Sequence, residues 1–201
     1  WGIQEVYGMH NIPDFPAGEF AIRHGALLAA ADEFEVIIEG RGSHAAAPHN
    51  GADSNLAAAH VIVALQSIAS RNVDPVKQVV VSVTTVQSDT DSHNVLPQSV
   101  RLRGTVRTLD EAVRDLAEAR FHDVVTHTAA AYQCGAKISY MRGYPVTVNH
   151  PDQTDFAADI AESVAASGKV ERKQPPTMGG EDFSFMLEAR PGAFIFMGNG
   201  D

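Results

Sequence analysis

The middle of the chain switches between two hydrophobic periodicities, and this switching limits the possible folds more than any other feature. In the segment 34–39, apolar residues alternate with more polar ones, which predicts a half-buried strand. From residue 54 to residue 69, apolar residues recur at helical spacing, and Asp53 or Ser54 can cap this helix. The β-branched run 79–86 then predicts a second strand.

The next part of the chain repeats these patterns in a different order. The segment 100–106 alternates apolar and basic residues, which predicts a strand with one wet face. Asp110 is placed to cap a second helix, and 137–140 predicts a fourth strand. The expected apolar stripe of this helix is Val113, Leu116, Ala117, Phe121, Val124 and Thr128. The order β-α-β-β-α-β over 32–144 predicts a ferredoxin-like unit: an antiparallel four-stranded sheet with two helices on one face.

The two flanks, 1–31 and 145–201, have a different character from the middle. Neither flank alone has enough apolar residues at regular spacing to form a convincing core. Together they predict one α/β domain that is interrupted by the middle unit. The chain starts at Trp1 without Met and stops on a turn directly after the apolar run 193–197, so we expect both ends to be cuts.

Charge and cysteine content exclude some function classes. The formal net charge is −10, from 15 basic and 25 acidic residues, which disfavours binding to a phosphate backbone and so argues against nucleic acid. No apolar run approaches the roughly 18 residues of a membrane span. The single cysteine, Cys134, cannot form an intrachain disulfide, which fits a reducing, cytoplasmic location.

Two histidines lie beside glycines, where a side chain can reach into a cleft. His10 follows a short possible strand on an expected turn, and imidazole is a common ligand for Zn, Mn, Co or Ni. The same spacing also suits a hydrogen-bonded surface or core histidine. His44 follows Gly42 and precedes small alanines, so it could donate a hydrogen bond to a developing oxyanion. His49 could orient His44 or simply be solvated.

Two other segments carry polar side chains that could contact a substrate. Asn94 offers two donors and an acceptor for a carbonyl or carboxylate group, although asparagine is also a common turn residue. Glu181 and Asp182 follow two glycines and could approach a metal or a substrate. They could equally stabilise the N-terminus of a helix through its dipole.

The order of six short motifs is far more specific than any one of them. In chain order they are Gly8-Met9-His10-Asn11, Gly40-Arg41-Gly42-Ser43-His44-Ala45-Ala46-Ala47-Pro48-His49, Asn94-Val95-Leu96-Pro97, Arg103-Gly104-Thr105-Val106-Arg107-Thr108, Gly180-Glu181-Asp182-Phe183 and Arg190-Pro191-Gly192-Ala193. This series resembles the metallo-amidohydrolase family of hippurate hydrolases, plant auxin-conjugate hydrolases and bacterial N-acyl-amino-acid hydrolases, which is related to aminoacylase and zinc carboxypeptidases. The resemblance runs over essentially the whole chain.

The resemblance implies an architecture and a role for four residues. The family has a catalytic α/β domain with a smaller lid domain inserted in it, and the lid corresponds to 32–144. By this resemblance His10 is a metal ligand, and His44 stabilises the tetrahedral oxyanion, often in the site of a partner subunit. Asn94 contacts substrate, and Glu181 lies at the edge of the catalytic cleft and contacts substrate as well.

The same resemblance implies that most of the metal site lies outside this chain. The family's upstream Cys-x-His motif, its Glu-Glu pair and its final histidine are not present in these 201 residues. Cys134 falls in the lid segment and cannot replace the missing cysteine ligand. A site with His10 as its one family ligand should bind metal only weakly.

The expected function is therefore that of a piece of a metal-dependent amidohydrolase. The intact protein is expected to use a divalent metal (Zn, Mn, Co or Ni) to split N-acyl amino acids into a carboxylic acid and an amino acid. The expected partners are this small substrate and a second subunit bound through the lid. This chain alone is expected to be inactive. The alternatives are a metallo-dipeptidase or carboxypeptidase fragment and a non-catalytic lid or dimerisation module.

Overall fold

In the computed structural model of the chain, three stretches of sequence form two compact units. The structure describes residues 2–13, 15–166 and 168–200. The first unit combines Trp1–Ala30 with Tyr144–Asp201, and the second unit is Ala31–Gly143. Both units contain helices and strands, which confirms the predicted α/β class.

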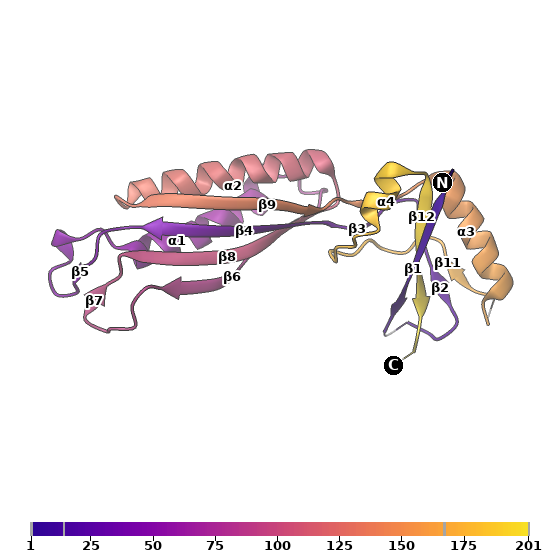
Figure 1. Ribbon diagram of the computed structural model, residues 1–201, viewed down its shortest axis with the longest axis horizontal. Coiled ribbons are helices and arrows are strands. Elements are labelled where there is room, and N and C mark those ends of the chain that lie inside the picture. The colour runs from indigo at the N-terminus through magenta and orange to yellow at the C-terminus, as the bar shows by residue number, and fades with distance from the viewer. Residues whose placement is uncertain (1, 14, 167, 201) are drawn as a thin grey trace. The chain divides into compact units, whose positions relative to one another are not determined.

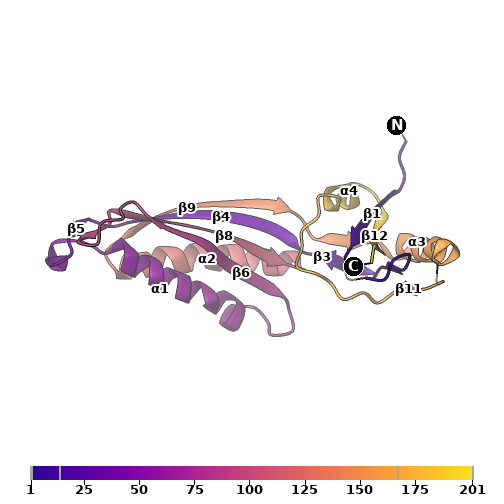
Figure 2. The same ribbon diagram turned by 90° about the horizontal axis from the view of Figure 1, so that it is seen from below.

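The second unit is a four-stranded sheet with two long helices. Its main elements are β4 (Ala30–Glu39), α1 (Ser54–Ser67), β6 (Val79–Ser88), β8 (Ser99–Thr108), α2 (Glu111–Ala131) and β9 (Gly135–Tyr144). The strands hydrogen-bond in the order β6-β8-β4-β9, and β6 runs antiparallel to β8. Figure 1 and Figure 2 show α1 and α2 side by side on one face of this sheet. The order of elements is the one that the periodicities predict.

The core of the second unit lies between its sheet and its helices. On β4, Phe34, Val36 and Ile38 are buried, as their alternation predicts. The rings of Phe34 and Phe121, from β4 and α2, lie 4.5 Å apart between centroids. Fully burying one large apolar side chain stabilises a fold by about 1.5–3 kcal/mol. This layer therefore contributes strongly to the stability of the unit.

The two helices of this unit begin as predicted, but the apolar stripe of α2 was predicted partly wrongly. The side chains of Asp53 and Asp110 accept backbone hydrogen bonds at the starts of α1 and α2. Leu116, expected in the stripe, is 38% exposed, whereas Val125 and Ala129 are buried. The buried apolar residues follow an i, i+4 row along the whole helix, from Val113 to Ala129, and Leu116 lies beside this row. Among the described residues, no helix is long and apolar enough to cross a membrane.

A buried ion pair ties both ends of the second unit's chain to α2. Asp32 on β4 is 1% exposed and Arg114 on α2 is 4% exposed. Arg114 Nη2 donates to Asp32 Oδ1 at 2.6 Å, and Arg114 Nε donates to Asp32 Oδ2 at 3.1 Å. The Tyr140 hydroxyl and the Gly143 backbone N–H, both on β9, donate to the same carboxylate at 3.1 Å each. One carboxylate therefore joins β4, α2 and β9.

The charged state of this cluster is maintained by its own contacts. Burial by itself lowers the pKa of Arg114, but the hydrogen bonds and the negative charge of Asp32 outweigh burial, so the pKa is raised. Burial, and then the charge of Asp32, raise the pKa of Tyr140, so its hydroxyl stays a donor. A buried pair of this kind becomes strongly destabilising when one partner is removed, because the other charge stays buried without a partner.

The first unit has a smaller sheet built from both flanks of the chain. Its strands hydrogen-bond in the order β1 (Val6–Ile12), β12 (Gly192–Gly198), β2 (Phe20–Ala21) and β11 (Val170–Glu171). Strands β3 (Gly25–Leu28) and β10 (Thr147–Asn149) form a separate antiparallel pair. Helices α3 (Pro151–Val164) and α4 (Ser184–Ala189) contact β12 and β10, respectively. The prediction of a buried strand at 193–197 is confirmed by Ala193, Phe194 and Phe196.

Replacing Asp32 by Asn should lower the free energy of unfolding by about 3–5 kcal/mol, because Arg114 then stays buried without its counter-charge. Chemical denaturation followed by circular dichroism measures this change. The matched control is Asp123→Asn, which breaks the exposed pair of Asp123 with Arg120 and should cost less than about 1 kcal/mol. Equal losses in the two variants would contradict a special contribution from the buried pair.

Candidate functional site

A short strand pair at one end of the second unit places the segments that carry His44 and Asn94 side by side (Figure 1). Strand β5 (Ser43–His44) pairs antiparallel with β7 (Val95–Leu96). Directly beside this pair, the backbone N–H of Ala45 donates to the carbonyl of Asn94 at 2.9 Å. Both candidate side chains are exposed, so a ligand can reach both of them. We call residues 40–47 and 94–98 the tip of the second unit.

The imidazole of His44 has a defined proton position. The backbone N–H of Ala46 donates to Nδ1 of His44 at 3.1 Å, so Nδ1 is the unprotonated nitrogen. In the neutral ring the proton is then on Nε2, which is free to donate to an external group. Such a donor can stabilise negative charge that develops on a substrate oxygen. It is thus Ala46 that contacts Nδ1, while His49 is exposed in the 3-10 turn Pro48–Asn50.

Close backbone packing positions the turn that carries His44. A Cβ at Gly40 would lie 2.2 Å from the carbonyl oxygen of Ala52, so a residue with a side chain cannot occupy this position without a shift. The buried hydroxyl of Ser54, the first residue of α1, donates to the carbonyl oxygen of Pro97 at 2.9 Å. The glycine turn and the segment that follows Asn94 are therefore both held against the start of α1.

His10 lies inside β1, opposite Phe196 on β12, and not on a turn as predicted. The prediction was wrong because the parallel pairing with β12 extends the strand through the Gly-Met-His-Asn motif. The ring is exposed, and its Nδ1 lies 2.5 Å from the carbonyl oxygen of Asn11. A carbonyl accepts only from a protonated nitrogen, so Nε2 keeps a lone pair. In this tautomer a histidine can bind a metal through Nε2.

The described residues do not form a complete metal site. Among residues 2–13, 15–166 and 168–200, no group of three or more His, Cys, Asp or Glu side chains could hold a metal ion. His10 has the right donor atom for one coordination bond, but a metal site in a protein needs about three or four such ligands. The chain by itself does not fit the metal centre that the sequence resemblance implies.

Glu181 has a structural contact of its own. Its Oε1 accepts a hydrogen bond from the backbone N–H of Phe183 at 3.2 Å, and the side chain is half-buried just before α4. The backbone carbonyl of Glu181 also accepts from the hydroxyl of Ser184 at 2.6 Å. Glu181 thus lies just before the N-terminus of α4, as in the alternative of a helix-dipole interaction, although no side chain caps this helix. Its expected contact with substrate stays a prediction.

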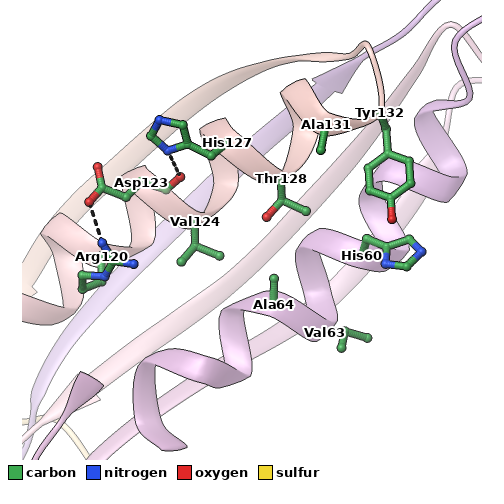
Figure 3. A pocket seen from close by; sticks show the side chains of 10 residues that line it. All are labelled: His60, Val63, Ala64, Arg120, Asp123, Val124, His127, Thr128, Ala131 and Tyr132. Atoms are coloured by element: carbon green, nitrogen blue, oxygen red, sulfur yellow. Dashed lines mark hydrogen bonds and ion pairs between the residues drawn. The ribbon is translucent and has the colours of Figure 1, made fainter. Parts of the chain in front are cut away.

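A groove of about 630 Å³ between α1 and α2 is separate from the tip (Figure 3). The rings of His60 and Tyr132 stack at one end of it, 4.6 Å apart. On α2, Asp123 pairs with Arg120 at 2.8 Å, and His127 donates to the carbonyl of Asp123 at 2.7 Å. These polar groups bond within their own helix and do not converge on a shared point, so we assign the groove no function.

Sequence reasoning missed the Asp32–Arg114 pair, although a signal was present. Asp32 continues the inward-facing positions of Phe34, Val36 and Ile38, and a charged residue in such a row indicates a buried partner. Cys134, the single cysteine of the chain, is free and buried. It is 6% exposed, and burial raises the pKa of its thiol, which makes it a poor nucleophile.

Comparison with known proteins gives consistent relatives for this chain. It is 40% identical over 198 residues to N-acetyl-L-cysteine deacetylase of Bacillus subtilis (strain 168), covering 98% of this chain and 46% of the relative. It is 34% identical over 198 residues to thermostable carboxypeptidase 2 of Saccharolobus solfataricus, with 98% and 49% covered. It is 34% identical over 194 residues to hippurate hydrolase of Campylobacter jejuni, with 96% and 50% covered. The chain thus spans about half the length of the curated relatives it matches.

The fold comparison and the family comparison agree with these relatives. A crystal structure of a Bacillus subtilis protein, described as a dinuclear metal binding peptidase from the M20 family, superposes with a TM-score of 0.79 at 30% identity. The match covers 98% of this chain and 48% of that protein. The family described as peptidase family M20/M25/M40 matches residues 1–201. The chain therefore belongs to peptidase family M20/M25/M40.

Proposed function

We propose that this chain is part of a metal-dependent amidohydrolase. The enzyme cleaves hippurate-like N-acyl amino acids into a carboxylic acid and an amino acid. The observation that carries the proposal is the short strand pair at the tip, in which His44 lies opposite Val95, the residue after Asn94, with the His44 proton on Nε2. The family membership and the relatives named as a deacetylase and a hippurate hydrolase support the reaction class.

The residues of this chain act on the substrate carbonyl in the proposed reaction. When water adds to an amide carbonyl, negative charge develops on the oxygen. The Nε2–H of His44 donates to that oxygen, and the hydrogen bond is stronger in the transition state than in the bound amide. The Asn94 amide can donate to a substrate carboxylate or carbonyl and so hold the amide in one orientation. Glu181 is proposed to lie at the edge of the substrate cleft.

We propose that the whole protein containing this chain binds a divalent metal, such as Zn, Mn, Co or Ni, with His10 as one ligand. The lone pair on Nε2 of His10 and its exposure support this role. When bound, such a metal supplies an activated water. Because this chain offers one candidate ligand and no ligand set among its described residues, we propose that the chain alone is inactive.

The proposed architecture is a lid domain, 32–144, inserted between two parts of a catalytic domain, 1–31 and 145–201. The β-α-β-β-α-β order and the sheet order of the second unit support a ferredoxin-like lid. We also propose a homodimer formed through the lid and a cytoplasmic location, for which the single cysteine is the support.

A second candidate function is a metallo-carboxypeptidase, favoured by the relative named thermostable carboxypeptidase 2. Both functions need an oxyanion donor, so the role of His44 does not distinguish them. The two functions differ in the substrates that they cleave. An N-acyl amino acid with a benzoyl or acetyl group tests the first function, and a peptide with a free N-terminus tests the second.

Replacing His44 by Ala in the whole protein should lower kcat for N-benzoylglycine by about 100- to 1,000-fold, the effect of removing one oxyanion donor. Metal content, measured by mass spectrometry of the purified protein, should not change. The matched control is His49→Ala, an exposed histidine in the 3-10 turn that follows β5, which should keep kcat within about threefold. Unchanged turnover in His44→Ala would remove the oxyanion role.

Replacing His10 by Ala in the whole protein should lower metal affinity by about 10- to 100-fold or more, because one coordinating nitrogen is lost from the site. Competition with a fluorescent chelator measures the affinity. His24→Ala changes another exposed histidine of the first unit and serves as the control. Equal metal affinity in the His10 variant and the parent would exclude His10 as a ligand.

A further inference from the structure

We propose that Gln98 is a positioning residue that holds His44 in its donor geometry. Its importance for turnover rests on the proposed function, whereas its effect on the His44 ring does not. The side-chain amide of Gln98 makes two hydrogen bonds to the glycine turn. Oε1 accepts from the backbone N–H of Gly42 at 3.1 Å, and Nε2 donates to the carbonyl of Gly40 at 2.9 Å.

The backbone of Gln98 adds a third bond between the same two segments. Its carbonyl accepts from the backbone N–H of Gly40 at 2.8 Å. Gln98 follows Asn94 by four positions, and Gly42 precedes His44 by two. One residue thus connects the strand that leads into His44 with the segment that carries Asn94. All the donor and acceptor atoms of the primary amide except one N–H are used in these contacts.

The tip needs such a link because its own elements are weak. Strands β5 and β7 are two residues each, far shorter than the 5 or 6 residues typical of a strand, so the pair fixes its own register poorly. Gly40 and Gly42 also lose more conformational freedom on folding than other residues would. Two bonds from one amide add to the backbone bonds of this turn and restrict it further, and with it the Ala46 N–H to His44 Nδ1 contact.

The test is NMR of the ¹⁵N-labelled 201-residue chain carrying Gln98→Met, which keeps the side-chain length but removes both hydrogen bonds. The His44 ring signals are identified by their loss in His44→Ala. We expect the Nδ1 and Nε2 shifts of His44 to move toward the average of the two tautomers. Amide hydrogen exchange of Gly42 and Ala46 should become about twofold to tenfold faster, the weight of one hydrogen bond.

Two further variants make this result specific. Gln98→Glu keeps an acceptor for the Gly42 N–H but loses the donor to Gly40, so Gly42 should stay protected while the His44 shifts move part of the way. Gln66→Met makes the same chemical change on α1, where Gln66 Nε2 donates to the carbonyl of Ile62 at 3.3 Å. It should leave the His44 ring and Ala46 unchanged.

The proposal is overturned if Gln98→Met exposes Gly42 to exchange but leaves the His44 ring and Ala46 as in the parent. In that case the amide holds the turn without positioning the histidine. Equal shifts of the His44 ring in Gln98→Met and Gln66→Met would also overturn it, because the effect would then be general loosening of the unit.

Kinetics on the whole protein separate this inference from the proposed function. If both hold, Gln98→Met lowers kcat for N-benzoylglycine by about twofold to tenfold with unchanged metal content, and Gln98→Glu recovers part of the loss. Unchanged turnover in His44→Ala contradicts the proposed function, and the NMR result still decides the role of Gln98. A large loss in His44→Ala with no loss in Gln98→Met contradicts the inference alone.

Discussion

The second unit depends on the Asp32 carboxylate of β4, which is buried among donors from two other elements, α2 and β9. It joins the start of β4, the first turns of α2 and the end of β9. Strand β4 runs from this carboxylate through the apolar core to the Gly40 turn, and that turn leads directly into His44. The buried charge of Asp32 and the candidate catalytic His44 therefore lie at opposite ends of one continuous segment of the chain. Replacing such a charge by packed apolar groups is often tolerated, whereas removing one partner is not.

The tip shows a second way of fixing a functional side chain, by backbone and amide contacts at an exposed end. The N–H of Ala46 sets the tautomer of His44, and the Gln98 amide holds the glycine turn in front of it. An exposed donor costs little to keep solvated, and it gains strength when substrate and protein exclude water around it. Rigid support around an open donor is what catalysis by preorganised hydrogen bonding requires.

Much of the fold of the second unit could be predicted from the sequence, because the hydrophobic periodicity and the helix-capping residues indicate the same elements. Alternation placed Phe34, Val36 and Ile38 inside, and Asp53 and Asp110 began the two helices. The exposure of Leu116 could not be predicted, because apolar side chains on two adjacent faces of a helix do not indicate which face packs against the sheet. The closeness of the two segments that carry His44 and Asn94 could not be predicted either. Two-residue strands leave no periodicity, and the bonds of Gln98 join positions far apart in the chain.

We propose that the Nε2–H of His44 stabilises the charged carbonyl oxygen of the transition state. The most direct measurement compares how tightly the whole protein and its His44→Ala variant, both fully loaded with metal, bind two inhibitors. One inhibitor is a phosphinic analogue of the tetrahedral intermediate, and the other is a non-hydrolysable analogue of the ground-state amide. We expect the variant to lose about 100-fold or more in affinity for the tetrahedral analogue, with little change in affinity for the ground-state analogue. Equal losses for the two inhibitors would contradict it.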